Sequence, residues 1–127
     1  MATQLLINLS NHPYEQWCEN QRSAAIKYGE VVDIPFPPVD EKEDEIYIKH
    51  LAHGLLDNIL QYAKTNNITV HVMGELTLSF LLVNMLAKHN IQCIASTSKR
   101  IIKSTSPGIK NEVIFKFERF RKYILNE

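Results

Sequence analysis

Small polar side chains follow three short apolar runs of this sequence, at positions where they could bind a phosphate group. The runs are residues 4–9, 69–73 and 91–95. Hydroxyls, the backbone N–H groups of a helix that starts at a glycine, and a guanidinium all bind anions. The polar residues that follow the runs are Ser10, Asn11 and His12, then Gly74, Glu75 and Thr77, and then Ser96, Thr97, Ser98 and Arg100.

These groups come together if the apolar runs are neighbouring strands of one parallel sheet. The patterns predict strands at 4–9, 31–34, 69–73, 91–95 and 112–120, and helices at 14–28, 48–63 and 75–89. The acidic segment 40–45 suits the N-terminus of the second helix. The order predicts one α/β domain over residues 1–127, a small doubly wound, mainly parallel sheet with an antiparallel C-terminal edge strand. In such sheets ligands bind at the carboxyl ends of the strands.

Charge is distributed unevenly along the 127 residues, although the formal net charge is zero. Residues 88–127 hold nine of the 14 Lys and Arg residues but only three of the 14 Asp and Glu residues. A basic C-terminal third favours an anionic partner, with solvated surface lysines as the simpler explanation for several of these positions.

Several classes of protein are not indicated by the sequence. It has neither GxGxxG nor GxxxxGK[ST], so the common dinucleotide and nucleoside triphosphate enzymes are not expected. The first residues lack the pattern of a signal peptide, and the longest apolar stretch, residues 76–87, is interrupted by polar residues. We therefore expect a cytoplasmic protein without a cofactor, and neither a membrane nor a long nucleic acid as its partner.

The histidines and cysteines give weak signals for a metal or a nucleophile. His50, His53 and Asp57 could share a helix face, but solvent-facing side chains are the better interpretation than a zinc site, and we expect no metal. His71 lies within a predicted strand and is interpreted as a structural histidine whose hydrogen bonds are satisfied. Cys18 and Cys93 form no CxxC pair and are expected to be buried, reduced thiols.

Four segments of the chain together resemble the small Csx-type CRISPR-associated proteins, which are Rossmann-like relatives of the CARF sensor domains. The segments are the first strand ending in Asn11-His12, the turn at 74–77 before an apolar helix, the run 95–100 (Ala-Ser-Thr-Ser-Lys-Arg), and the closing run 117–123 (Phe-Glu-Arg-Phe-Arg-Lys-Tyr). The resemblance covers most of the chain and is most specific in its C-terminal half.

The resemblance implies a homodimer that binds a cyclic oligoadenylate, the messenger of type III CRISPR antiviral defense, and cleaves it as a metal-independent ring nuclease. His12 would then carry a proton, and Arg100 and Thr97 would hold the phosphate. Glu75 and Ser98 depart from the pattern, so binding is better supported than cleavage. Trp17, Tyr14 or Tyr123 could stack on adenine. The alternatives are a non-catalytic sensor or sponge for the same messenger, and a dimeric protein-interaction module.

The helix predicted at 75–89 gives a separate argument for a homodimer. Its apolar residues cover more of its surface than packing on one face of a small sheet requires. They include Leu78, Leu81, Leu82, Met85 and Leu86. On the sequence alone, we expect this helix to contribute to contact between two copies of the chain.

Overall fold

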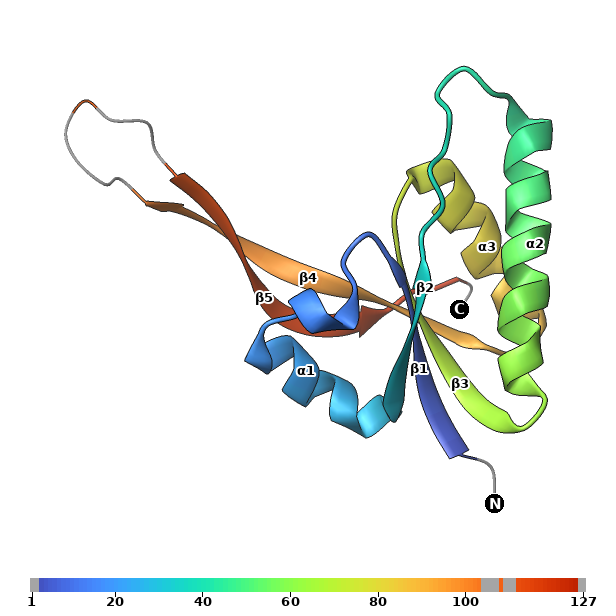
Figure 1. The fold of residues 1–127 in the computed structure, drawn as a ribbon, viewed down its shortest axis with the longest axis horizontal. Helices are drawn as coiled ribbons and strands as arrows, with labels where there is room; N and C mark the ends of the chain where they lie inside the picture. Colours follow the sequence, from blue (N-terminus) through green and yellow to red (C-terminus); the bar gives the residue numbers. More distant parts are fainter. Residues whose placement is uncertain (1–2, 104–107, 109–111, 126–127) are drawn as a thin grey trace.

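The computed structural model describes residues 3–103, 108 and 112–125, and contains one five-stranded sheet with the order β2-β1-β3-β4-β5. The first four strands are parallel, and β5 is antiparallel to β4 (Figure 1). This confirms the predicted α/β fold with its antiparallel edge strand. The strands are β1 (Thr3–Ser10), β2 (Glu30–Pro35), β3 (Asn66–Met73), β4 (Gln92–Lys103) and β5 (Glu112–Lys122).

Helices cover both faces of the sheet, as a doubly wound fold requires. Helix α1 (Glu19–Ala25) packs on one face, and α2 (Glu45–Ala63) and α3 (Leu76–Lys88) pack on the other (Figure 1). The larger core lies under α2 and α3, and the smaller core lies under α1, where Trp17 meets Phe117 and Phe120 of β5. Strand β1 contributes to both cores, which explains its nearly continuous run of apolar residues.

The acidic segment before α2 marks the start of that helix, as predicted. The Asp44 carboxylate accepts hydrogen bonds from the backbone N–H groups of Ile46 (3.1 Å) and Tyr47 (3.2 Å), so Asp44 caps the helix. His50, His53 and Asp57 are exposed on α2, in agreement with the solvent-facing interpretation.

The continuous helix predicted at residues 14–28 is wrong, because the structure breaks this segment into three short pieces. A 3₁₀ helix spans Tyr14–Gln16, α1 follows, and a second 3₁₀ helix spans Ile26–Tyr28. Trp17 and Cys18, which lie between the first 3₁₀ helix and α1, have an extended backbone with ψ angles of 141° and 164°. The indole N–H of Trp17 donates to the carbonyl of His12 (3.0 Å), and the ring is buried, so tertiary contacts override the helical spacing.

The turn predicted at residues 96–100 is also wrong, because these residues belong to β4. Strand β4 pairs with β3 only as far as Ile94, and then continues with β5 as its single partner. The phenol of Tyr123 donates to the carbonyl of Val72 (2.6 Å), which follows the last β3 residue that pairs with β4. The outer parts of β4 and β5 therefore project from the sheet as a two-stranded arm (Figure 1).

The apolar residues of α3 have a simpler explanation than contact between two copies. Leu78, Leu82 and Leu86 are fully buried in the larger core, and Leu81 and Met85 pack against it. The exposed apolar residues of this helix are Leu76 (83% exposed) and Phe80 (74%), which lie one turn apart. The residues named in the sequence argument are thus explained by the core and give no argument for a dimer. Leu76 and Phe80, which that argument did not name, face solvent.

None of the helices in the described segments has the length and apolar character needed to cross a membrane. Cys93 is a buried free thiol, as predicted, whereas Cys18 is free but exposed. Burial raises the pKa of Cys93 to about 12, so this thiol stays protonated and acts as a small apolar side chain.

Two glycines give a matched test of packing. A Cβ on Gly74 would overlap the ring of buried Phe36, whereas a Cβ on Gly54, within α2, would meet no atom within 4 Å. We expect Gly74→Ala to lower the free energy of unfolding by about 1–3 kcal/mol, because the core is overpacked. Gly54→Ala should raise it by about 0.5–1 kcal/mol through helix propensity. Urea denaturation of both variants checks the two signs, and equal effects would contradict this account of Gly74.

Candidate functional site

A cleft of about 460 Å³ opens at the carboxyl ends of β1 and β3 and beside the middle of β4, on the face that carries α1. Strand order reverses between β1 and β3, since the chain passes from β1 to β2 on one side and later to β3 on the other. Ligands of open α/β sheets bind at this kind of switch point. The cleft is lined by Ser10, His12, Gln16, Trp17, Cys18 and Gln21, by His71 and Met73, and by Ser96, Ser98, Phe115 and Phe117.

The side chain of Asn8, in the middle of β1, has a fixed orientation below this cleft. Its amide nitrogen lies 2.9 Å from an Asp33 carboxylate oxygen and 2.9 Å from the carbonyl of His12. Both are acceptors, so the NH₂ group must face them and the amide oxygen must face the other way. That oxygen lies 2.9 Å from Nδ1 of His71, the residue opposite Asn8 on β3.

The orientation of Asn8 fixes the tautomer of His71. Because Asn8 presents an oxygen, Nδ1 of His71 must carry the hydrogen, and Nε2 is left with a lone pair. The ring is 2% exposed and packs edge-on against Trp17 (5.6 Å between centroids) and Phe120 (5.5 Å). Nε2 has no hydrogen-bond partner among the described residues. The predicted structural histidine is therefore only half satisfied.

Burial, together with the charge of nearby His12, lowers the pKa of His71 to about 4. At neutral pH the ring is therefore uncharged and Nε2 is a hydrogen-bond acceptor. Leaving a buried acceptor without a donor costs about 1–3 kcal/mol. A ligand with an amino or hydroxyl group that reached the floor of the cleft would recover this loss.

The loop after β1 places His12 at the cleft. The carbonyl of His12 accepts hydrogen bonds from the Asn8 amide and from the Trp17 indole, and its N–H donates to the Ser10 hydroxyl (3.2 Å). These bonds hold the backbone while the imidazole stays exposed. His12 is thus an accessible titratable group beside a buried neutral one. Asn11, also predicted as a ligand-binding residue, is exposed and does not line the cleft.

A β-bulge in β5 brings its aromatic rings to the side of the strand pair that carries the Ser96 and Ser98 hydroxyls of β4. The register shifts between Thr97 and Ser98, so that Ser96 pairs with Phe120 and Ser98 pairs with Phe117. Phe117 and Phe120 are three residues apart and would face opposite sides of a regular strand; the bulge turns both toward α1. Ser96 and Ser98, two of the predicted ligand-binding residues, line the cleft.

Thr97 and Arg100 lie outside the cleft lining. The Thr97 hydroxyl donates to the carbonyl of Arg119 (3.1 Å) and accepts from its N–H (3.3 Å), so it holds β5 at the bulge. Arg100 lies opposite Phe115, which does line the cleft, and its side chain is exposed on the arm. Arg100 can therefore meet a ligand that extends from the cleft along β4.

The N-terminus of α3, which the sequence predicts as an anion site, is occupied by a side chain of the protein itself. The Glu75 carboxylate caps α3 by accepting from the N–H of Leu78 (2.8 Å). The Thr77 hydroxyl and the Leu78 N–H lower the pKa of Glu75, so it is a carboxylate that fills the position of an external anion. Glu75 and Thr77 line a different, acidic cleft beside α2, and Gly74 packs against Phe36. The structure therefore separates residues 74–77 from Ser10, His12 and Ser98.

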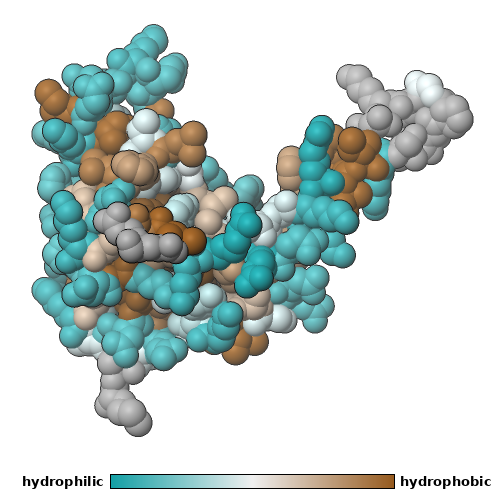
Figure 2. Space-filling view, turned by 180° about the vertical axis from the view of Figure 1, so that it is seen from behind, coloured by the Kyte–Doolittle hydropathy of each residue, from teal (hydrophilic) through white to brown (hydrophobic). Residues whose placement is uncertain are grey.

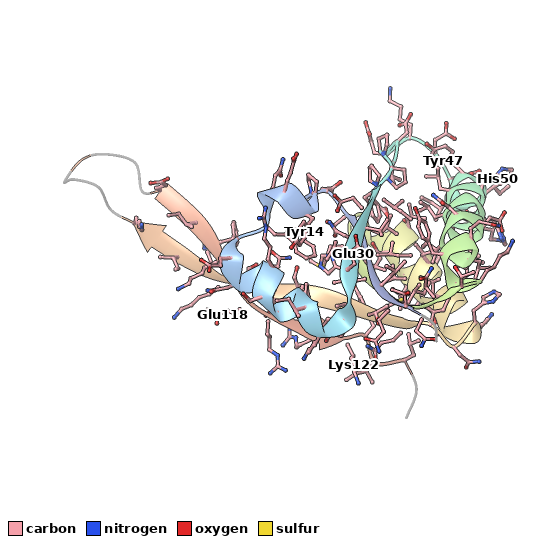
Figure 3. All side chains as sticks on the ribbon, turned by 60° about the horizontal axis from the view of Figure 1, so that its bottom comes forward. Tyr14, Glu30, Tyr47, His50, Glu118 and Lys122 are labelled. Atoms are coloured by element: carbon pink, nitrogen blue, oxygen red, sulfur yellow. The ribbon has the colours of Figure 1, made fainter. Side chains whose placement is uncertain are left out.

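The weak metal signal on α2 lies far from the candidate site. Figure 3 shows Tyr47 and His50 on α2, across the molecule from Tyr14, which lies beside the α1 side of the sheet. Within residues 3–103, 108 and 112–125, no group of three or more His, Cys, Asp or Glu side chains is placed to hold a metal ion. Tyr14 packs edge-on against Trp17 (5.4 Å), so it supports the wall of the cleft from behind.

Sequence reasoning missed the Asn8–His71 pair. Both residues interrupt runs of apolar residues in strands that are buried on two faces. A polar residue at such a position must find a partner or a function, and this is the signal that could have identified the pair.

Comparison with protein families matches residues 4–121 to the model of the uncharacterized protein MJ1673 family. No curated protein and no solved structure matches the chain.

The lowered pKa of His71 predicts a pH dependence of stability. The unfolded state takes up a proton near pH 6.5 and the folded state only near pH 4, so stability is complete above pH 6.5 and falls as the pH drops through this window. The total loss from this group is about 3 kcal/mol. Urea denaturation between pH 7 and 4 should show that the free energy of unfolding of His71→Gln falls less with pH than that of the wild-type protein, because the variant lacks the contribution of this histidine. Identical pH profiles for the two proteins would contradict a buried neutral His71.

Proposed function

The chain belongs to the uncharacterized protein MJ1673 family, and we propose that it binds a cyclic oligoadenylate, such as cyclic tetra-adenylate, in the cleft beside β1, β3 and β4. The main support for the proposal is one hydrogen-bond acceptor. The buried Nε2 of His71, at the switch point of the sheet, is an acceptor without a partner among the described residues. The exocyclic amino group of adenine and the ribose 2′-hydroxyl are both donors of the required kind.

The walls of the cleft suit the other parts of a nucleotide. Phe115 is 68% exposed and lines the cleft, so its ring is available for stacking on adenine. Ser96 and Ser98 supply hydroxyl donors for phosphate oxygens. Arg100 adds a guanidinium on the same side of the strand pair as Phe115. A compact polyanion with several adenines matches this combination of a stacking surface, hydroxyls and a guanidinium.

We extend the proposal to cleavage of the bound ring without a metal ion. His12 accepts the proton of a ribose 2′-hydroxyl, and the 2′ oxygen attacks the adjacent phosphorus in line with the 5′ oxygen. The P–O5′ bond breaks as the P–O2′ bond forms, and the departing 5′ oxygen takes a proton from water. The products carry a 2′,3′-cyclic phosphate and a 5′-hydroxyl. Positioning and neutralisation of charge supply most of the rate.

Binding without cleavage is the second candidate, and two observations favour it. The Thr97 hydroxyl is engaged by Arg119, and Arg100 lies outside the lining of the cleft, so His12 is the predicted catalytic residue that remains at the cleft. A protein of this kind would act as a sensor or sponge for the messenger in type III CRISPR antiviral defense. In either case a two-fold symmetric ring would suit a homodimer.

The two most exposed phenylalanines of the described chain provide a test of where the ligand binds. Phe115 lines the cleft, whereas Phe80 lies on α3, on the other face of the sheet, with similar exposure. We expect Phe115→Ala to weaken the binding of cyclic tetra-adenylate by roughly tenfold to a hundredfold, because base stacking is worth about 1–3 kcal/mol. Phe80→Ala should leave the affinity unchanged. Isothermal titration in chelator measures both, and equal losses would contradict this placement.

Substitutions of His12 and Arg100 separate catalysis from binding. His12→Ala should lower the single-turnover rate of cleavage by roughly a hundredfold with little loss of affinity. Arg100→Ala should weaken binding about tenfold or more, since a charge-assisted contact is worth about 1.5–3 kcal/mol. His53→Ala, an exposed histidine on α2, is the control. Binding of the intact ring with no linear product from any of the proteins would support the sensor or sponge over the nuclease.

A further inference from the structure

The two-stranded arm, residues 98–103 of β4 and 112–117 of β5, has no other part of the sheet beside it. Strand β3 stops pairing with β4 at Ile94, and from there the arm projects away from the helices (Figure 1). A two-stranded ribbon alone is at best marginally stable in water. Yet the arm exposes Ile102 (56%) and Val113 (42%), which lie opposite each other in register, and Figure 2 shows apolar residues among hydrophilic ones there.

The other face of the arm is basic. Lys99 lies directly opposite Lys116, and like charges at paired positions destabilise a strand pair. Lys103 pairs with Glu112, the acidic residue of these two segments. This face therefore combines a like-charge lysine pair with the neighbouring pair Ile101 and Ile114, and an acidic, partly apolar partner would suit it.

A surface of the complementary kind exists on the opposite side of the sheet. A cleft of about 470 Å³ lies between the starts of α2 and α3, and its carboxylates are Asp40, Glu41, Glu43, Asp44, Glu45 and Glu75. Apolar side chains line it between these charges: Val39, Ile48 and Leu81. Leu76 and Phe80, the exposed apolar residues of α3, are sequence neighbours of the residues that line it.

We propose that the arm of one copy of this chain docks in the acidic cleft of a second copy. Lys99 and Lys116 then meet the carboxylates, and Ile101 and Ile114, a pair on the same face of the arm, pack against the apolar residues of the cleft. Each copy has one arm and one such cleft, so a two-fold arrangement occupies both pairs and closes the assembly. The lysines of the arm and the carboxylates of the cleft then neutralise each other between the two copies.

This association does not depend on the proposed binding of a nucleotide. The acidic cleft lies on the opposite face of the sheet from the cleft beside β1, β3 and β4, where we propose that the nucleotide binds. The two clefts share no residue. The arm is the link between them, because Phe115, on the arm, also lines the nucleotide cleft. Docking of the outer arm would hold the Phe115 side of that cleft in place without covering it.

A charge-swap experiment tests the docking. One variant carries Lys99→Glu and Lys116→Glu in the arm; the other carries Glu41→Lys and Glu43→Lys in the cleft. In the proposed arrangement neither variant pairs with itself, whereas a mixture of the two restores both contacts. Sedimentation of the wild-type protein should give a dimer, each variant alone should dimerise at least about tenfold more weakly, and an equimolar mixture should recover the dimer. Lys64→Glu and Asp57→Lys, two exposed positions on or next to α2, are the matched controls.

Three results would overturn the proposal: a wild-type protein that stays monomeric, variants that dimerise as tightly as the wild type, or a mixture that stays monomeric. Circular dichroism establishes that each variant is folded. Should one fail to fold, association of the wild-type protein is measured in rising salt instead. Docking by charge weakens about tenfold or more as the salt rises, and association that salt leaves unchanged would contradict it.

Discussion

The hydrogen bonds of the Asn8 amide join the three strands and the loop around which the candidate site is built. The amide nitrogen reaches Asp33 of β2 and the carbonyl of His12, and the amide oxygen reaches His71 of β3. An amide can satisfy this set of partners in one orientation only. That orientation places the hydrogen of His71 on Nδ1 and leaves Nε2 as a buried acceptor. The chemistry available at the floor of the cleft therefore depends on one asparagine in the middle of a strand.

The outer wall of the cleft depends on a different constraint, the departure of β4 from β3. If β4 had continued along β3, residues 96–98 would have been part of a flat sheet and the cleft would have lost a side. Instead β4 turns away after Ile94 with β5, and the Tyr123 hydroxyl bonds to the carbonyl of Val72, beyond the last paired residue of β3. Ser96 and Ser98 lie on one side of β4 by the ordinary alternation of a strand, and the bulge, whose extra residue is on β5, brings Phe117 to that side. Hydroxyls that the sequence places in a turn are in fact held on a strand.

The two clefts differ in charge because the sequence separates its acidic and basic residues. The acidic residues before and at the start of α2 stabilise that helix through its dipole, and Glu75 does the same for α3. Seven of the nine cations of residues 88–127 lie on β4 and β5, at the edge of the sheet and away from those helix starts. A protein with zero formal net charge thus presents one surface suited to an anion and another suited to a cation.

The sequence by itself determined the α/β fold, the order of its elements, the start of α2 and the edge strand β5. These features follow from local periods and capping residues, which act within a few positions of the chain. Local patterns could not predict the break at Trp17 and Cys18, because the buried indole and its bond to His12 outweigh the helical spacing. Nor could they predict the continuation of β4, which needs β5 as a partner, or the lone pair of His71. That lone pair results from contact between residues 63 positions apart, and only the tertiary structure brings them within hydrogen-bond distance.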